Sequence, residues 1–314
     1  MNILIIKLGA TGDVVRTTPL LAKFTCRVTW VTAAKNLSLL DGLQENLQCV
    51  PWEERGRVAN ECYDLVINLE DTLEPGRYVQ NLKCGRVFGA YLEAGDQLTY
   101  TEDSRDWFDL SLISRFGKQV ADRLKLENRR SYQDLIFSGL GFRFNGEMYR
   151  LPEPAWTDLT GDVAIAPEAG PVWPMKNWAH YDVLKQKLES RGLVVNVLPR
   201  RETLLEHLGD VRNHRCLVGG DSLPMHFALG TGTRCVTLFN CTSPWEIYDY
   251  GLQQKIISPL LAEFFYQRDR DPRATTAIGL DEVFHEVMTQ LDAPVPANCQ
   301  KYPANVQNTV GSGA

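Results

Sequence analysis

The sequence predicts an α/β protein in which two doubly wound parallel sheets, each in its own domain, face each other across a cleft. Short apolar runs alternate with helical patterns both before and after residue 150, as is typical of parallel sheets covered by helices. Between the two series lies Leu151-Pro-Glu-Pro154, whose prolines indicate a linker. The 314 residues, 44% of them hydrophobic, suffice for two cores. We therefore expect domains at 1–152 and 153–291, followed by a disordered polar tail at 292–314.

The clearest local signal lies in the first twenty residues. The β-branched run Ile3–Ile6 predicts a buried strand, a loop with Gly9 and Gly12 follows, and Asp13 stands where a helix begins. A strand, a glycine loop and a helix in this order bring backbone N–H groups up to an anionic ligand. The glycine spacing fits neither the dinucleotide motif GxGxxG nor the phosphate-binding loop GxxxxGK(S/T). The alternative is a tight turn in which Asp13 only caps the helix.

The other elements follow from the same pattern of apolar runs. In the first half we expect strands at 26–32, 64–69 and 86–91 and a short helix at 35–43. In the second half we expect strands at 162–166, 192–198, 216–222 and 234–239 and helices at 178–191 and 281–291. Glu70 and Asp71 come directly after a strand, where open α/β sheets bind ligands. They can equally cap the next helix.

The segment 104–130 departs from this alternation. Its apolar residues recur every three or four positions, which predicts one amphipathic helix, with Gly117 either tolerated or marking a break. The segment carries seven basic and four acidic residues, an excess of three positive charges in an acidic protein. This excess favours a site for an anionic acceptor or a membrane surface. A solvated face with internal ion pairs explains it as well.

Composition excludes several classes of function. The net charge of −6 argues against broad nucleic-acid binding, and no stretch approaches the ~20 apolar residues that span a bilayer. The first strand is followed by Gly-Asp rather than by a cleavage-site pattern, so we expect no signal peptide. The eight cysteines are scattered without a C-x-x-C pair, as in reduced cytoplasmic proteins. The five histidines lack metal-ligand spacing, so we expect a cytoplasmic protein with no metal site.

A second constellation lies at 218–230. A strand ends at Gly219 and Gly220, and Asp221 and Ser222 open a helix that carries His226 near its start. Free N–H groups, a hydroxyl and an imidazole at one helix start are suited to hold a diphosphate. The alternative is a capped helix with His226 packed inside.

Three stretches, 5–20, 172–178 and 220–230, together resemble glycosyltransferase family 9, the family of the ADP-heptose:lipopolysaccharide heptosyltransferases. They contain Gly9-Ala-Thr-Gly-Asp13, Trp173-Pro174 followed by Trp178, and the run from Gly220 to Gly230. The resemblance implies a GT-B fold of two Rossmann-like domains, with the acceptor bound by the N-terminal one and the nucleotide sugar by the C-terminal one. It further implies transfer with inversion at the anomeric carbon, without a metal or other cofactor.

The resemblance also implies roles for individual residues. Asp13 matches the catalytic base, which takes the proton of the acceptor hydroxyl. The donor diphosphate would contact the following residues: Thr11, Gly12, Asp221, Ser222, Leu223 and His226. The family often has a lysine two positions before Trp-Pro, where this sequence has Pro171. Lys176 is our substitute for that cation, with Arg200 and Arg201 as alternatives.

The partners implied are a nucleotide-sugar donor, ADP-heptose foremost, and an anionic or lipid-linked glycan acceptor such as lipopolysaccharide core. Peripheral contact with the inner membrane would accompany a lipid-linked acceptor. Two other functions fit the same residues less directly. One is a non-catalytic nucleotide-sugar-binding protein that kept the fold, and the other is a sugar-nucleotide epimerase, which the order of the motifs disfavours.

Overall fold

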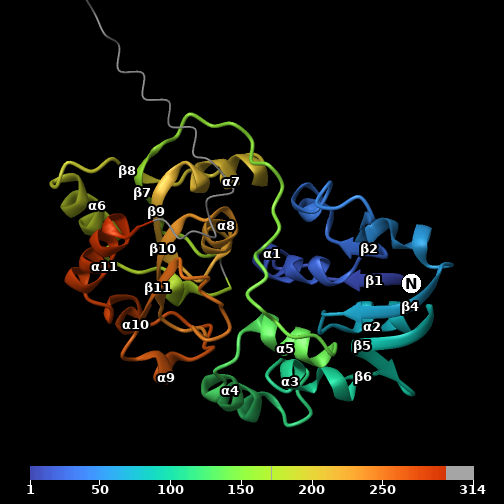
Figure 1. The fold of residues 1–314 in the computed structure, drawn as a ribbon. Helices are drawn as coiled ribbons and strands as arrows, with labels where there is room; N and C mark the ends of the chain where they lie inside the picture. Colours follow the sequence, from blue (N-terminus) through green and yellow to red (C-terminus); the bar gives the residue numbers. More distant parts are fainter. Residues whose placement is uncertain (171, 295–314) are drawn as a thin grey trace, which may run out of the picture.

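The computed structural model describes residues 1–170 and 172–294, which form two sheets side by side (Figure 1). The first sheet has the strand order β3-β2-β1-β4-β5-β6, in which only the edge strand β6 is antiparallel to its neighbour. Its strands are β1 (Asn2–Ile6), β2 (Arg27–Thr32), β3 (Leu47–Pro51), β4 (Cys62–Asn68), β5 (Lys83–Glu93) and β6 (Gln97–Tyr100).

The second sheet is parallel throughout, with the order β11-β10-β9-β7-β8. Its strands are β7 (Gly161–Ala166), β8 (Val195–Val197), β9 (His214–Gly220), β10 (Arg234–Phe239) and β11 (Gln253–Ile257). The prediction of two parallel α/β sheets from apolar runs is therefore confirmed.

Helices cover both faces of each sheet (Figure 1). Those of the first half are α1 (Thr11–Thr17), α2 (Leu73–Gln80), α3 (Arg105–Phe108), α4 (Lys118–Glu127) and α5 (Tyr132–Gly139). Those of the second half are α6 (Tyr181–Glu189), α7 (Leu204–Arg212), α8 (Leu223–Thr231), α9 (Leu261–Phe264), α10 (Pro272–Thr276) and α11 (Leu280–Asp292). Among these described helices none is long and apolar enough to cross a membrane.

The run Ile3–Ile6 shows why the first strand is continuously apolar. Ile3 and Ile5 are fully buried against α1 and α5, while Leu4 and Ile6 are fully buried against the layer that contains α2. A strand buried on both faces has no polar face to display, so its sequence does not alternate.

Each sheet reverses its strand order at one point. In the first sheet the chain leaves β1 for β2 on one side and returns to β4 on the other. In the second sheet it leaves β7 for β8 and returns to β9. The two loops that leave such a point diverge, and open α/β sheets bind their ligands in the resulting crevice at the carboxyl ends of the strands.

The prediction of one helix over 104–130 was wrong. The segment contains α3 and α4 joined by a turn, and Gly117 just before α4 has a φ of 78°, a value that favours glycine. The alternative that Gly117 marks a break is confirmed. The expected helix at 35–43 is a short 3-10 turn, Ala34–Leu39. Of the tail expected at 292–314, residues 295–314 lie outside the described part of the chain, as does Pro171.

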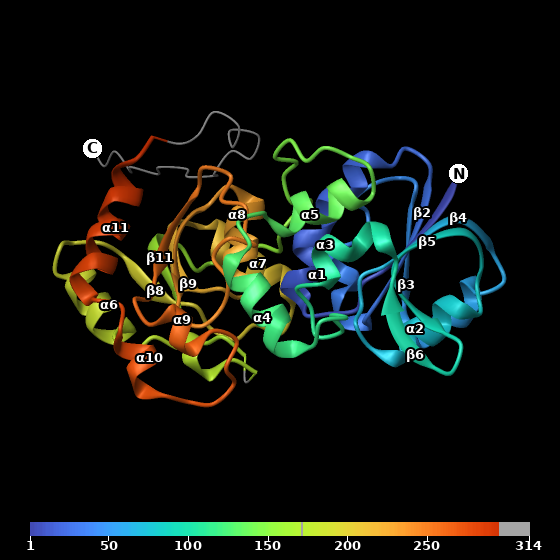
Figure 2. The ribbon, with the colours of Figure 1, turned by 90° about the horizontal axis from the view of Figure 1, so that it is seen from below.

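The two halves touch along α1 and α8, which lie at the junction of the sheets (Figure 1). At Gly12 in α1 the contact is tight, because a Cβ there would lie 2.7 Å from Cδ2 of His226. α4 also lies at the junction (Figure 2), and just past its end Arg129 lies 3.8 Å from the centre of the Trp245 ring. The helices that follow β1 and β9, the strands at the two switch points, therefore meet at this junction.

Candidate active site

A cavity of about 730 Å³ lies between the two sheets. The first half contributes the loop after β1, the start of α1 and the residues just past β4. The second half contributes Ala169, Gly170, Val172, Trp173 and Lys176, the start of α8 and the loop 242–247. The structure brings together here every residue that the sequence nominated for the site: Thr11, Gly12, Asp13, Lys176, Asp221, Ser222, Leu223 and His226.

Asp13 is held on the first turn of α1 by the backbone. The residue at the N-cap position is Ala10, and the N–H of Asp13 donates to the Ala10 carbonyl at 2.9 Å. The Asp13 side chain makes no capping bond and stays 32% exposed where it lines the cavity. The alternative that Asp13 only caps the helix was therefore wrong.

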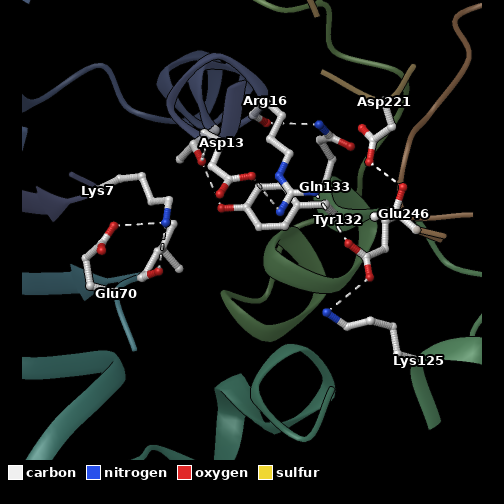
Figure 3. A network of polar contacts seen from close by, with 12 residues as sticks. Lys7, Asp13, Arg16, Glu70, Lys125, Tyr132, Gln133, Asp221 and Glu246 are labelled. Carbon is white, nitrogen blue, oxygen red and sulfur yellow. Dashed lines mark hydrogen bonds and ion pairs between the residues drawn. The ribbon is translucent and has the colours of Figure 1, made fainter. Parts of the chain in front are cut away.

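Arg16 is the nearest charged neighbour of this carboxylate. Its Nη2 lies 2.9 Å from Oδ1 of Asp13, and its guanidinium lies 4.2 Å from the centre of the Tyr132 ring (Figure 3). Burial raises the pKa of Asp13, but the positive charges of Arg16 and Lys7 outweigh burial, so the pKa lies below its usual value. Asp13 is therefore ionised at neutral pH and free to accept a proton.

Lys7 and Glu70 fix the loop that leads from β1 to Asp13. The Nζ of buried Lys7 lies 2.9 Å from Oε1 of Glu70 and donates to the Leu69 carbonyl at 3.3 Å. Glu70 also accepts from the backbone N–H of Leu8 at 2.8 Å. Thr72, not Glu70 or Asp71, occupies the N-cap position of α2. The acidic pair after β4 therefore belongs to the ligand edge of the sheet, and both residues line the cavity.

On the opposite wall Lys176 pairs with Asp221. Its Nζ lies 3.0 Å from Oδ2 of Asp221 and donates to the Asp221 carbonyl at 2.5 Å. Thr242 donates to the same carboxylate at 2.9 Å. Burial raises the pKa of Asp221, but the charge of Lys176 and these hydrogen bonds lower it to about 2. Asp221 is thus ionised beside Lys176, at the place where a diphosphate would be received.

The other two candidates for the missing cation are engaged elsewhere. Arg201 pairs with Asp210 at 2.6 Å, and Arg200 pairs with Glu168 at 2.9 Å on the surface. Of the three candidates, Lys176 is the one found among the described residues that line the cavity.

His226 is both packed and part of the cavity wall. It lies on the first turns of α8, is 4% exposed, and its ring meets Gly12 of the other half. Burial lowers the pKa of His226 to about 4, so the imidazole is neutral at physiological pH. Its Nδ1 is buried without a hydrogen-bond partner among the described atoms. A buried polar atom of this kind is costly unless a ligand or solvent satisfies it.

Sequence reasoning missed several charged residues of the site. Glu246 of the second half is 4% exposed, and its carboxylate lies 3.5 Å from Arg16 and 3.5 Å from Lys125 of α4 (Figure 3). Arg16 follows Asp13 by one helical turn, so spacing alone would have found it. Glu246 lies 230 residues from Arg16, and only the fold brings them together.

Most basic side chains of the segment 104–130 are engaged by acidic neighbours. Arg115 pairs with Asp109 at 3.0 Å, and Arg130 pairs with Asp106 at 2.6 Å. Of the seven basic residues, Lys125 lines the cavity. The interpretation as a face with internal ion pairs therefore fits this segment better than a free cationic patch. Within residues 1–170 and 172–294 no three His, Cys, Asp or Glu side chains are grouped as metal ligands.

Solved structures with a similar fold include heptosyltransferases. The E. coli heptosyltransferase WaaC, solved with ADP, is 16% identical, with a TM-score of 0.60 over 92% of this chain and 100% of WaaC. E. coli ADP-heptose lipopolysaccharide heptosyltransferase II is 14% identical, with a TM-score of 0.61 over 93% of this chain and 98% of its own. The chain has the GT-B fold. A glycosyltransferase family 9 structure from Veillonella parvula shares the GT-B fold at 15% identity, with a TM-score of 0.59 over 92% and 97% of the two chains.

The GT-B fold implied by three short stretches is thus confirmed over nearly the whole chain. No protein-family model and no curated protein matches this sequence. At such low identity the likeness is one of fold, and the chemistry has to be argued from the side chains of the cavity.

Proposed function

We propose that the protein is an inverting, metal-independent glycosyltransferase that moves a sugar from a nucleotide-activated donor to a hydroxyl of a glycan acceptor. One observation carries the proposal. An ionised carboxylate, Asp13, faces the start of α8 and the Lys176–Asp221 pair across a single cavity at the carboxyl ends of two sheets. ADP-heptose is the first donor to test, because the similar structures include one solved with ADP and one with ADP-2-deoxy-2-fluoro heptose.

The second half, residues 153–291, would bind the donor. Free N–H groups at the start of α8, near Ser222 and Leu223, together with the charge of Lys176, suit the two negative charges of a diphosphate. These groups would stabilise the leaving nucleoside diphosphate as its bond to the sugar breaks, and they would do so without a metal. Thr11, Gly12 and His226 would complete the donor contacts from the junction of the halves.

The first half, residues 1–152, would bind the acceptor and activate it. As the acceptor oxygen attacks the anomeric carbon from the face opposite the nucleotide, its proton passes to the Asp13 carboxylate. One carbon–oxygen bond forms while the bond to the diphosphate breaks, and attack from the opposite face inverts the anomeric centre. A core oligosaccharide of lipopolysaccharide in the cytoplasm is the acceptor that the family resemblance favours.

A second function is favoured by one specific observation. Arg16 holds the Asp13 carboxylate at 2.9 Å and lowers its pKa, which weakens it as a base. A protein that binds nucleotide sugars without transferring them would tolerate this pairing. Saturable stabilisation by ADP-heptose without release of ADP, either to acceptor oligosaccharides or to water, would support this alternative.

The experiment that tests the proposal is the Asp13→Asn variant assayed for ADP release from ADP-heptose with oligosaccharide acceptors. General-base catalysis contributes about 10²–10⁴-fold, so we expect kcat to fall at least about 100-fold while ADP still binds. Asp64→Asn is the control, because Asp64 lies in β4 and bonds to Asn2 at the other end of the same sheet. Activity of Asp13→Asn within a few-fold of the wild type would contradict the proposed mechanism.

A further inference from the structure

The first-half wall of the cavity is acidic and apolar beyond Asp13. Asp71 follows the end of β4 and is half-buried, and Asp122 lies on α4, where it pairs with Lys118 of the preceding turn. The segment 107–112 lines the same cavity and adds apolar surface from Trp107 and Leu112, the latter 61% exposed. Carboxylates beside an aromatic or aliphatic surface suit a sugar, since its hydroxyls donate to the carboxylates and its C–H face packs on the apolar groups.

Basic and acidic side chains line the cavity in equal numbers. Its described lining includes six basic residues (Lys7, Arg16, Lys35, Lys125, Lys176 and Arg268) and six acidic ones (Asp13, Glu70, Asp71, Asp122, Asp221 and Glu246). Four of the six basic side chains lie within 3.5 Å of a carboxylate of this same lining. The two left over are Lys35, on the 3-10 turn after β2, and Arg268, which lies 5.3 Å from the Trp173 ring.

A nucleotide-sugar donor would change this balance. Its diphosphate brings two negative charges, which equal the charge of Lys35 and Arg268 together. A phosphate or carboxylate of the acceptor would then enter a cavity with no cation of the described lining left over, where Asp71 has no partner among those cations and Asp122 is paired with Lys118 outside the lining. Like charges in a partly buried cavity repel more strongly than in water, so such an acceptor would bind weakly.

We infer that the part of the acceptor held beside Asp13 is an uncharged sugar, bound through its hydroxyls by Asp71 and Asp122 and through its apolar face by Trp107 and Leu112. This inference rests on the proposed function and names its acceptor class. It differs from the expectation of an anionic acceptor, which drew on the basic composition of 104–130. The ion pairs of that segment remove most of the support for a charged acceptor.

The test is equilibrium binding, with and without ADP, of neutral glucose and mannose oligosaccharides and of the same oligosaccharides carrying a phosphate monoester. We expect the neutral member of each pair to bind at least about tenfold more tightly, and its affinity to change less than about twofold between 50 and 300 mM NaCl. Asp71→Asn should weaken neutral binding roughly tenfold, and Asp71→Lys should reverse the preference within each pair. Asp64→Asn, at the opposite end of β4, should change neither the affinity for neutral oligosaccharides nor the preference within each pair.

Tighter binding of the phosphorylated members, or binding of neither set, would overturn the inference. Turnover of ADP-heptose with phosphorylated acceptors alone would overturn it while leaving the proposed function in place. Neutral preference without any binding of ADP or ADP-heptose would support the inference about the acceptor wall and count against the proposed function.

Discussion

Arg16 and Asp13 form the residue-scale unit on which the chemistry depends. The Arg16 guanidinium keeps the Asp13 carboxylate ionised but also makes it a weaker base. Its other terminal nitrogen, Nη1, lies 3.5 Å from Oε2 of Glu246. The stacking of Arg16 on Tyr132 fixes its position, so the carboxylate is held in one place. The Arg16 side chain thus sets both the position and the charge state of Asp13.

This unit predicts a pH dependence. In the wild type the pKa of Asp13 lies below its usual value, so kcat/KM for transfer should stay level from pH 8 to about 4.5. In Arg16→Gln the main attraction for the ionised form is lost while burial remains, so the pKa rises and the acidic limb should move to higher pH. Arg16→Lys keeps the charge and serves as the control. Superimposable profiles for the wild type and Arg16→Gln would refute this prediction.

The sequence indicated those site residues that lie within a local pattern. Asp13, Asp221 and His226 stand at helix starts after apolar strands, and Lys176 stands close to Trp173-Pro174. Lys7 and Glu246 were missed because their partners are far away in the sequence, 63 residues for Lys7 and 230 residues for Glu246. A charged residue whose partner is distant in the sequence leaves no local signal, so only the fold shows that such a pair is made.

At the scale of elements, central strands were predictable, but of the edge strands only β8 was predicted, while β3, β6 and β11 were not. The strands β1, β4, β9 and β10 have nearly continuous buried runs. The strands β3 and β11 lie at sheet edges, are mostly half-buried and mix polar with apolar residues, so they leave no clear pattern. The helices α5 and α7 were missed as well, although Ser131 and Thr203 cap them. Reading these caps would have placed both helices.

The contact between α1 and α8 gives a prediction at this scale. In Gly12→Ala the added methyl group would lie 2.7 Å from the His226 ring, so the two helices must separate. We expect a loss of about 1–3 kcal/mol in the free energy of unfolding, together with lower transfer activity. The control is Gly56→Ala, because a Cβ at Gly56 meets nothing within 4 Å. Equal stability of the two variants in urea unfolding would show that the helices are not in tight contact.

At the scale of the whole molecule, Glu246 joins the two halves. Its buried carboxylate belongs to the second half and receives Arg16 of α1 and Lys125 of α4 from the first (Figure 3). Lys125 also lies 4.3 Å from the Tyr266 ring of the second half. Charge pairs therefore cross the junction in the lining of the cavity, and we expect the distance between the donor and base walls to depend on them.

Neutralising this residue should loosen the junction. Glu246→Gln leaves two largely buried cations with weaker partners, so we expect a loss of about 3 kcal/mol in the free energy of unfolding. Glu168→Gln is the matched control, because its pair with Arg200 is exposed and should contribute less than about 1 kcal/mol. If urea unfolding showed similar small losses for both variants, the bridge would not hold the halves together.

The division of labour between the two halves is tested most directly by the dissociation constant of ADP, measured by calorimetry for the wild type, Asp13→Asn, Lys176→Gln and Lys176→Arg. The account predicts that Lys176→Gln weakens ADP binding about 10- to 100-fold, that Lys176→Arg stays within a few-fold, and that Asp13→Asn does not weaken binding. Unchanged affinity in Lys176→Gln, or an equal loss in Asp13→Asn, would contradict a donor site at the start of α8 with the base on the opposite wall.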